Sequence, residues 1–494
     1  MKIKSKIAAL NKLFGININK NKKESEPFFK RFELSKFVLQ KAINMSTDIK
    51  IRKGLTLRLK GAPSNTLKIA PPSTQFALKP TDFHGVFPKL VCKEGDEVQA
   101  GQPLFYSKYQ DSIQFVSPVS GTVKEIRRGA KRKVLEIMIS ADKKQQSVLH
   151  KLPSLGKITP EQIKEQLLAS GNWPFIKQRP YDIVANPNAT PKAIFVSALA
   201  TAPLSAQYDV VLEGQQDAFQ LGMNMLSKLS PNLHLTIGAK ETSQIAQTKN
   251  CTIHRIKGPH PAGNVGVQIH HIDPINVGET VWVVGAEDVA NIGRFFQTGV
   301  FDASRTLAVA GHPLTSPSYY KSTIGASLEP LLDDVGAENL ASLRVINGDV
   351  LTGTATSANG YVGYYNNTIS VLPEGNRYRM FGWLPFAGPN IHSMSNTSLS
   401  WLFPKKQYTP DTNLNGEERA LVVTGEMERV FPMDIYPMQL LKACMANDIE
   451  KMEQLGIYEV APEDFALIDY ANSSKIEAQA IIRDALDLMN KEVG

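Results

Sequence analysis

Cysteine is scarce in this sequence. Only three cysteines occur among 494 residues, namely Cys92, Cys251 and Cys444, and they lie far apart. Scattered thiols in a chain of this length are typical of a reducing compartment and not of a disulfide framework. Because no CxxC pair occurs, we expect neither a thiolate-bound iron–sulfur cluster nor a zinc site.

Long apolar runs are also missing. A membrane-spanning helix needs about 20 consecutive apolar residues, and no segment reaches that length. The uncharged stretch 193–208 is too short and contains a proline, and the stretch 380–404 is interrupted by prolines, glycines and asparagines. We therefore expect a body without membrane-spanning helices.

Excess charge is confined to the start of the chain. The formal net charge is +8, and the first 44 residues alone hold eleven Lys and Arg against three Glu. The remaining residues carry 44 basic and 44 acidic side chains. A neutral body offers no phosphate-tracking surface, so we expect no nucleic-acid partner.

The basic segment 1–45 has two interpretations. Its apolar residues recur at helical spacing between lysines: Ile3, Ile7, Leu10, Leu13 and Phe14. Such a helix could lie on a membrane surface. Alternatively, the segment is not native and the protein begins at Met45, which we favour because the charge is out of character with all that follows.

Histidines gather in one place. His260, His270 and His271 lie close in sequence, with His254 nearby, but the spacing H-x₉-H-H follows no usual ligand rule and no carboxylate cluster accompanies it. We interpret the segment as a turn followed by a strand with alternating faces. The alternative is a metal site.

Gly258, Gly263 and Gly266 form a weak glycine pattern. They do not follow a clear strand-to-helix junction, and two prolines intervene, so we do not interpret them as a phosphate-binding loop. No Ser-His-Asp or Cys-His arrangement and no carboxylate pair stands out. We therefore assign no catalytic residue, no metal ligand and no cofactor-binding residue.

Periodicity divides the body into five regions. Residues 46–150 alternate short strands with glycine turns. Residues 151–304 alternate apolar strands with helical stretches, which predicts a parallel α/β sheet. Residues 305–375 return to short strands around one helix, which indicates a β-grasp-like module. Residues 376–412 are an aromatic, proline-rich connector, and residues 413–494 are mostly helical.

The first of these regions resembles the barrel-sandwich fold of biotinyl and lipoyl domains. VCKEGDEVQAGQPL is followed by SPVSGTVKEI. Those domains carry a modified lysine eight residues before the proline of PVSG, a position that Gln110 holds here, with Lys108 two positions away. The resemblance implies a barrel-sandwich hybrid without a swinging-arm cofactor.

Several longer motifs resemble the NqrA subunits of the Na⁺-translocating NADH:quinone reductases. They are IKIRKGLTLRLKGAP, RRGAKRK, SGNWPFIKQRPYDIVANP, GPHPAGNVGVQIHH, RVINGDVLTGT and FPMDIYPMQLL. Together they extend essentially from Ser46 to the C-terminus. The chain is thus identified as a member of a family whose complex oxidises NADH, reduces a quinone and exports Na⁺.

The resemblance implies a particular place for the chain. We expect a peripheral subunit on the cytoplasmic face of the bacterial inner membrane, with five other subunits as partners, chiefly a membrane-embedded one. FMN, FAD and iron–sulfur cofactors would reside in those partners, and quinone would be a substrate bound near the last electron transfer. The isolated chain would not be catalytic. The rival interpretation is a purely structural adaptor that binds no quinone.

The family is related to the C subunit of the Rnf complex and to the flavin-binding NADH subunit of complex I. Those relatives hold FMN with a glycine-rich loop, because phosphates need bare backbone N–H groups. The corresponding stretch here runs from Gly171 to Ile176, where Trp173 is bulky and Pro174 lacks an N–H. The α/β region therefore resembles a Rossmann-like sheet that has lost its nucleotide loop, and we expect no tight binding of NADH or FMN.

The C-terminal region resembles a two-cluster ferredoxin domain without its iron. Two stretches keep the frame of a C-x₂-C-x₂-C-x₃-C-P run. The ligand positions fall at Leu421, Thr424, Met427 and Phe431 and at Pro462, Phe465, Ile468 and Asn472. None is Cys, so we expect Met427, Phe431, Phe465 and Ile468 to be buried in two clusters without metal. The alternative is a chance alignment.

Two groups of residues are candidates for partner contact. The first is a basic run on a predicted hairpin, which would face an acidic partner or anionic lipid headgroups unless it is a solvated turn: Arg127, Arg128, Lys131 and Arg132. The second lies in the aromatic connector and would dock a membrane subunit unless it packs locally: Phe381, Trp383 and Trp401.

Overall fold

The computed structural model describes residues 48–375, 391–394 and 398–494. The basic segment 1–45 lies outside these ranges, as do Phe381 and Trp383. Within them, no helix is long and apolar enough to cross a membrane.

Two small antiparallel sheets form the region that follows the first strands. One has the strand order β3 (Gln75–Leu78), β9 (Val134–Ala141), β8 (Gly121–Arg128) and β5 (Glu97–Val98). The other consists of β4 (Pro88–Leu90), β6 (Pro103–Ser107) and β7 (Gln110–Val116). Side chains of both sheets share one core, in which Phe105 of β6 stacks on Phe115 of β7 with ring centroids 4.5 Å apart.

The largest sheet has seven strands. Their order is β1 (Asp48–Lys50), β14 (Thr252–Lys257), β13 (Leu233–Gly238), β12 (Ile194–Ala198), β15 (Val281–Gly285), β10 (Ile176–Arg179) and β11 (Ile183–Val184). The first five strands are parallel, whereas β10 pairs antiparallel with β15 and β11.

Helices cover both faces of this sheet. Val196 of β12 lies in the core that includes α5 (Gln216–Leu229) and α7 (Ala286–Thr298), and its neighbour Phe195 packs with α6 (Val265–Ile272). Successive residues of a strand point to opposite faces, so α5 and α7 lie on one face and α6 on the other. The short helices α3 (Pro160–Ala169) and α4 (Tyr208–Val211) complete this region.

A third, six-stranded sheet follows along the chain. Its order is β19 (Thr354–Thr356), β18 (Leu343–Asn347), β20 (Thr368–Pro373), β16 (Ser304–Ala310), β17 (Ser318–Thr323) and β2 (Ser64–Ile69). The central strands β16 and β20 are parallel, and β16 forms an antiparallel pair with β17, as β20 does with β18. The helix α8 (Glu329–Asp334) belongs to the same region.

The first two strands of the chain lie outside the two small sheets that follow them. β1 pairs with β14 of the seven-stranded sheet, and β2 pairs with β17 of the six-stranded sheet. Ile51 and Leu57, between them, are buried in the core of the C-terminal helices. The first two strands of the expected region 46–150 thus pair with strands of other sheets, and pairing between distant strands leaves no sign in the local pattern.

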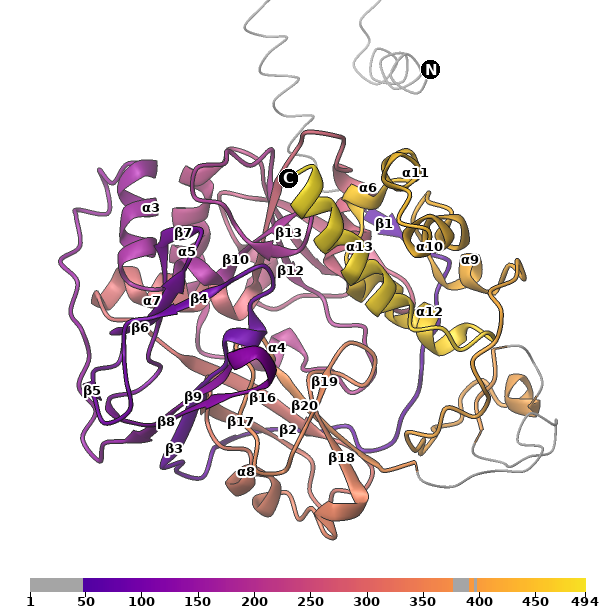
Figure 1. The fold of residues 1–494 in the computed structure, drawn as a ribbon, viewed down its shortest axis with the longest axis horizontal. Helices are drawn as coiled ribbons and strands as arrows, with labels where there is room; N and C mark the ends of the chain where they lie inside the picture. The colour runs from indigo at the N-terminus through magenta and orange to yellow at the C-terminus, as the bar shows by residue number, and fades with distance from the viewer. Residues whose placement is uncertain (1–47, 376–390, 395–397) are drawn as a thin grey trace, which may run out of the picture. The chain divides into compact units, whose positions relative to one another are not determined.

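The C-terminal region is helical. It contains α9 (Glu426–Val430), α10 (Pro437–Met445), α11 (Ile449–Gln454), α12 (Ala466–Ala471) and α13 (Ala478–Glu492), drawn in orange and yellow in Figure 1. The expected burial is confirmed: Met427, Phe431, Phe465 and Ile468 are at most 2% exposed. The expectation of two clusters was wrong, because all four belong to one core, in which the Phe431 and Phe465 rings lie 5.0 Å apart.

Candidate functional site

The seven-stranded sheet has a point at which its strand order reverses. The chain passes from β12 outward to β13 and β14 and then returns to β15 on the other side of β12. In open α/β sheets ligands bind at such a point, outside the carboxyl ends of the strands. The helix α7 begins there directly after β15, with Gly285 at its N-cap and Glu287 and Asp288 in its first turn.

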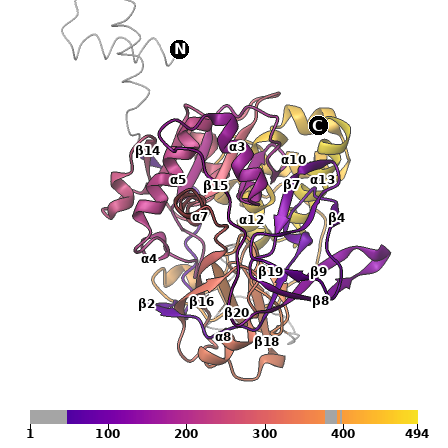
Figure 2. The same ribbon diagram turned by 90° about the vertical axis from the view of Figure 1, so that its left-hand side faces the viewer.

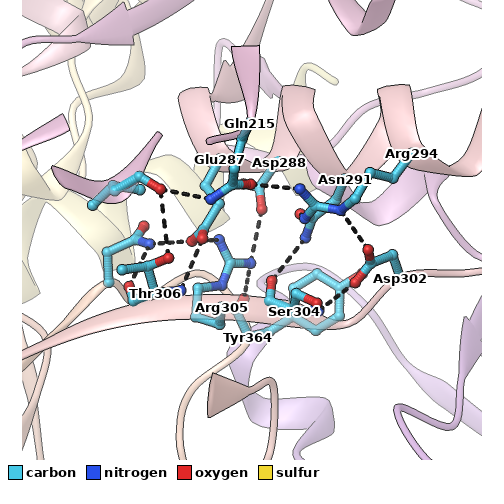
Figure 3. Close-up of polar contacts among 12 residues, drawn as sticks. Gln215, Glu287, Asp288, Asn291, Arg294, Asp302, Ser304, Arg305, Thr306 and Tyr364 are labelled. Carbon is cyan, nitrogen blue, oxygen red and sulfur yellow. Dashed lines mark hydrogen bonds and ion pairs between the residues drawn. The ribbon is translucent and has the colours of Figure 1, made fainter. Parts of the chain in front are cut away.

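A buried arginine closes this position. Arg305 of β16 donates through Nη2 to Asp288 Oδ1 at 2.7 Å and to the carbonyl oxygen of Tyr364 at 2.8 Å, and its Nη1 lies 3.5 Å from Glu287 Oε2 (Figure 3). Arg305 and Glu287 are each only 1% exposed. A buried charge is tolerated only when it is paired and hydrogen-bonded, and this arrangement meets that condition for all three groups.

The carboxylates have further donors. The backbone N–H of Thr306 donates to Glu287 Oε1 at 2.8 Å, and Asn367 Nδ2 donates to Glu287 Oε2 at 2.5 Å. Burial raises the pKa of both Glu287 and Asp288, and the Arg305 charge opposes that rise. The N-terminus of a helix is the usual place for a phosphate, and here the Asp288 carboxylate lies beside the N-cap, where a Cβ added at Gly285 would be 2.5 Å from Asp288 Oδ2.

A second arginine extends the network. Arg294 of α7 donates to Asp302, to the Asn291 amide oxygen and to the Gln215 amide oxygen, as Figure 3 shows. The Arg294 charge holds the pKa of Asp302 below its usual range, although burial opposes this effect. Each arginine is therefore matched by carboxylate and amide acceptors of the same chain.

A cavity of about 420 Å³ adjoins both arginines. Its charged lining residues include Arg294, Arg305 and Lys321 together with Glu287 and Asp302. Its apolar lining residues are Ile69, Ala70, Pro71, Pro72, Phe76 and Ala326. Nε of Arg305 is buried without a hydrogen-bond partner in the described structure. A cavity of this size holds a small ring with polar substituents.

The stretch that begins at Gly171 corresponds to the nucleotide loop of the related proteins, and here it packs against other parts of the protein. Gly171 has a φ of +73°, and a Cβ at this position would lie 2.4 Å from Cγ1 of Val116 on β7. Trp173 is 0% exposed, donates its indole N–H to the Ala185 carbonyl at 2.7 Å and packs edge-on against Trp282. The backbone at Gly171 thus packs closely against Val116 of the small sheets, and this packing leaves no room for a phosphate.

The glycines near the histidine group lie differently from the expectation. Gly258 directly follows β14, and Gly263 and Gly266 lead into α6, so the segment is a strand-to-helix junction after all. Added Cβ atoms at these positions would collide with Ile51, with Thr201 and with the Arg179–Asp464 pair. The glycines therefore allow close packing of the protein on itself.

His270 and His271 lie on the helix α6 and not on the expected strand. The backbone N–H of Asp434 donates to His270 Nε2 at 2.9 Å, so Nδ1 carries the proton and donates to Glu459 at 2.8 Å. His271 donates through Nε2 to the Pro432 carbonyl at 2.9 Å. Both histidines thus attach the C-terminal helices to α6.

An ion pair strengthens the same attachment. Arg179 of β10, 1% exposed, donates to Asp464 at 2.8 Å and to Glu463 at 2.5 Å. Asn264 donates to the Glu463 carbonyl at 2.9 Å. The histidine group therefore has a structural role, and no group of three or more His, Cys, Asp or Glu suited to a metal ion occurs in the part of the chain that the structure describes.

His260 is the exception among these histidines. It is 2% exposed, and its Nδ1 lies 3.1 Å from Thr201 Oγ1. Its Nε2 is buried and has no hydrogen-bond partner within the described ranges. Burial lowers the pKa of His260 to about 4, so the ring is neutral at physiological pH.

The expected basic contact residues lie at the tip of the β8–β9 hairpin, which projects from the body in Figure 2. Arg127 is paired with Glu136 at 2.8 Å. Arg128, Lys131 and Arg132 are exposed, and the last two have φ values of 52° and 60°. The tight turn thus points these three cations toward solvent.

The aromatic candidate Trp401 is 58% exposed. It lies in the segment before the C-terminal helices, which Figure 1 places on the opposite side of the molecule from β8 and β9. The structure therefore does not bring the basic hairpin and Trp401 together in one patch.

Sequence reasoning missed the Glu287, Asp288 and Arg305 network. Glu287 and Asp288 come one residue after the apolar strand VWVVG, and acidic residues at the carboxyl end of a buried strand are a recognisable signal. Neither of these two residues was singled out from the sequence. The local sequence around Arg305 does not indicate its role, because Arg305 belongs to the six-stranded sheet and meets Glu287 and Asp288 only in the folded protein.

These features define a class of protein: a multidomain α/β protein in which buried ion pairs fill the point where the strand order of the seven-stranded sheet reverses. Three family models match it in succession. They are the NqrA N-terminal barrel-sandwich hybrid domain over residues 49–142, the NqrA second alpha/beta domain over 158–301 and the NQRA C-terminal domain over 306–358.

Curated relatives match along almost their whole length. The NqrA subunit of the Na⁺-translocating NADH-quinone reductase of Marinomonas sp. (strain MWYL1) is 38% identical over 90% of this chain and 99% of its own. The corresponding subunits of Yersinia pestis bv. Antiqua (strain Angola) and Pasteurella multocida (strain Pm70) are 34% and 36% identical over 90% of this chain and 100% of theirs. The chain belongs to the NqrA family, the family of these subunits of the Na⁺-translocating NADH-quinone reductases.

A solved structure of an NAD⁺-reducing [NiFe]-hydrogenase is a more distant match. The TM-score is 0.35 and the identity 10%, over 70% of this chain and 67% of that one. A similarity at this level does not define a fold.

Proposed function

We propose that this chain is the subunit of the Na⁺-translocating NADH:quinone reductase that carries no redox cofactor, joins its partner subunits and takes part in the quinone step. Membership of the family makes it a subunit of an enzyme complex. The observation that supports the rest is at the N-terminus of α7, where a phosphate would meet the Asp288 carboxylate beside the N-cap and the ion pairs of Glu287 and Asp288 with Arg305.

The proposal excludes tight binding of NADH and FMN by this chain. A phosphate entering at α7 would meet two buried carboxylates, and one entering at Gly171 would meet Val116. Calorimetry of the purified chain with either ligand should give no saturable heat at micromolar concentration. A micromolar dissociation constant for either would contradict this part of the proposal. FMN, FAD and iron–sulfur centres then belong to the partner subunits.

For the quinone, the cavity beside Arg305 is the candidate site. A quinone ring needs an apolar slot with donors for its carbonyl oxygens. Here Ile69 and Phe76 supply apolar lining, and Lys321 supplies an ammonium group that can donate to a carbonyl oxygen. The competing proposal is a purely structural adaptor that binds no quinone.

A titration of the purified chain with a water-soluble short-chain benzoquinone separates the two. Saturable binding that Lys321→Met weakens and Lys143→Met leaves unchanged supports the quinone site, since Lys143 is exposed and outside the cavity. No saturable binding favours the adaptor.

We further propose that the basic hairpin tip contacts a partner among the five other subunits, chiefly a membrane-embedded one, on the cytoplasmic face of the bacterial inner membrane. The double variant K131E/R132E should reduce co-purification of the complex from native membranes. The exposed pair Lys143 and Lys144 gives a matched control, K143E/K144E. Equal yields for both variants would exclude the hairpin contact.

The finer fold assignments belong to the same proposal. The order β14, β13, β12, β15 of parallel strands supports a Rossmann-like sheet. The order β17, β16, β20, β18, with its parallel central pair, supports a β-grasp module of the SLBB-like type. The burial of Met427, Phe431, Phe465 and Ile468 supports a ferredoxin-like domain without clusters.

A further inference from the structure

A short turn exposes four large apolar side chains in nearly continuous sequence. The 3₁₀ turn Leu399–Leu402 and the residue after it form what we call the apolar turn. Its exposed fractions are 41% for Leu399, 58% for Trp401, 50% for Leu402 and 59% for Phe403. Single exposed apolar residues are common, whereas a contiguous group marks an interaction surface.

The apolar turn is held in place from both ends. Ser398, before it, is buried, accepts from the N–H of Ser400 at 3.4 Å and donates to the Ile391 carbonyl at 3.0 Å. Tyr408, after it, is 5% exposed. The exposure of the side chains between these anchors is thus a built feature of the fold.

Cations from two distant segments surround the apolar turn. Arg58 donates through Nε to the Pro404 carbonyl at 3.2 Å, although the two residues are 346 positions apart. The backbone N–H of Lys60 donates to the Tyr408 carbonyl at 3.0 Å. This pairing places two cations of the first segment beside Lys405 and Lys406. The basic collar is Arg58, Lys60, Lys405 and Lys406.

An acidic residue lies near the collar. Burial lowers the pKa of His312, Lys60 lowers it further and Asp411 raises it, so both charged residues lie near this histidine. The Asp411 carboxylate accepts from the backbone N–H and the side-chain amide of Asn413, at 3.1 and 3.0 Å. Asp411 supplies one negative charge against the four cations of the collar.

We propose that the apolar turn and the basic collar form a membrane-contact site that inserts its aromatic and aliphatic side chains among the headgroups of an anionic lipid bilayer. The inference rests on the proposed function, which puts the chain beside a membrane. Aromatic side chains and Arg occur at both kinds of interface, so the three lysines of the collar are what favour lipid over protein. Lys is depleted at protein–protein interfaces, whereas Trp beside Lys and Arg is typical of membrane–water interfaces.

Tryptophan emission provides a direct test on the full chain. Trp173 and Trp282 are fully buried, so in a Trp383→Phe background Trp401 is the tryptophan that vesicles can reach. The probe is a vesicle of phosphatidylcholine in which about a third of the lipid is anionic phosphatidylglycerol. Binding should shift the Trp401 emission to the blue, and lipids brominated near the headgroup should quench it. Vesicles of phosphatidylcholine alone should bind much more weakly.

Variants separate the two parts of the site. L402S/F403S should lower vesicle partitioning by about tenfold or more, because each side chain loses its apolar burial. Arg58→Gln and Lys405→Gln should each lower it by about fivefold, and only in anionic vesicles. Val277, 71% exposed and outside the site, provides the control Val277→Ser, which should change nothing.

The outcomes distinguish this proposal from the proposed function. Absence of a blue shift and quenching with anionic vesicles, or equal partitioning of L402S/F403S and Val277→Ser, would overturn the lipid contact. If L402S/F403S abolishes co-purification of the complex while the native chain ignores vesicles, the apolar turn binds a protein and the lipid proposal is wrong. If vesicle binding follows the expected pattern but the chain never co-purifies with other subunits, the proposed function fails and the lipid contact stands.

Discussion

Two interiors of this molecule are closed by opposite chemistry. At the carboxyl ends of β12 and β15, the crevice is closed by Arg305 with Glu287 and Asp288. Among the C-terminal helices, the interior is closed by apolar side chains such as Met427 and Phe465. Both are almost inaccessible to water, so the difference lies in how each would respond to the loss of one residue.

The comparison teaches where the molecule is vulnerable. A buried ion pair adds little stability compared with an apolar filling, yet loss of one partner leaves an uncompensated charge. An apolar interior loses only transfer free energy and gains a cavity. The polar crevice should therefore be the more fragile of the two, and it should also respond to pH.

The largest effect is expected from Arg305→Met, which leaves Glu287 and Asp288 buried without their cation. The local free energy of opening should fall by about 3–5 kcal/mol. Hydrogen exchange of peptides from α7 and β16 measures this loss region by region. The triple variant R305M/E287Q/D288N removes every charge and should recover part of the stability. If Arg305→Met alone leaves exchange in α7 unchanged, the network does not hold the crevice closed.

The matching change in the apolar interior is Met427→Ala. Met427 is 2% exposed, and truncating a buried methionine to alanine costs about 2–4 kcal/mol through lost burial and the cavity left behind. Exchange should increase in α9, α10 and α12 and stay constant in α7. A loss larger than that of Arg305→Met would reverse the comparison.

The third effect is a pH dependence of the stability that arises from His260. Its pKa is lowered by burial to about 4, against an ordinary value of about 6.5. Between these values the unfolded chain binds more protons at His260 than the folded chain, so stability falls as pH decreases through this window. The contribution over the whole window is about 3 kcal/mol.

Urea unfolding at pH 7 and pH 4.5, followed by the emission of the buried Trp173 and Trp282, measures this dependence. His260→Gln should reduce the difference between the two pH values. Burial shifts the pKa of Glu287 and Asp288 upward, so their contribution has the opposite sign: it is lost as pH rises. An unchanged pH dependence in His260→Gln would remove His260 from this account.

The smallest effect is expected at the surface. Arg127 pairs with Glu136 at 2.8 Å, but the arginine side chain is 49% exposed. Exposed ion pairs contribute at most about 1 kcal/mol, so Arg127→Met should barely alter exchange in β8 and β9. This variant also serves as the charge-matched control for Arg305→Met. A comparable loss of stability in both variants would show that burial does not explain the difference between the two ion pairs.

Much of the fold could be predicted from local patterns, and the failures have physical causes. Alternation of apolar strands with helices predicts the α/β region, and the burial of Phe465 and Ile468 follows from their apolar character. The segment VGVQIHHI, which forms α6, is short and rich in β-branched residues, so its pattern leaves helix and strand ambiguous. The closure of the crevice could not be predicted, because Arg305 comes from a different sheet.

The pairing of β1 with β14 and of β2 with β17 has a consequence for how the chain folds. Both strands leave the ribosome early, yet each finds its neighbour only after more than half of the chain has been made. Contacts between such distant segments form slowly, because a long loop must be closed first. During that interval the strands present unpaired edges, a hazard for aggregation. Fragments that stop before β14 should therefore be less soluble than fragments that omit residues 48–70.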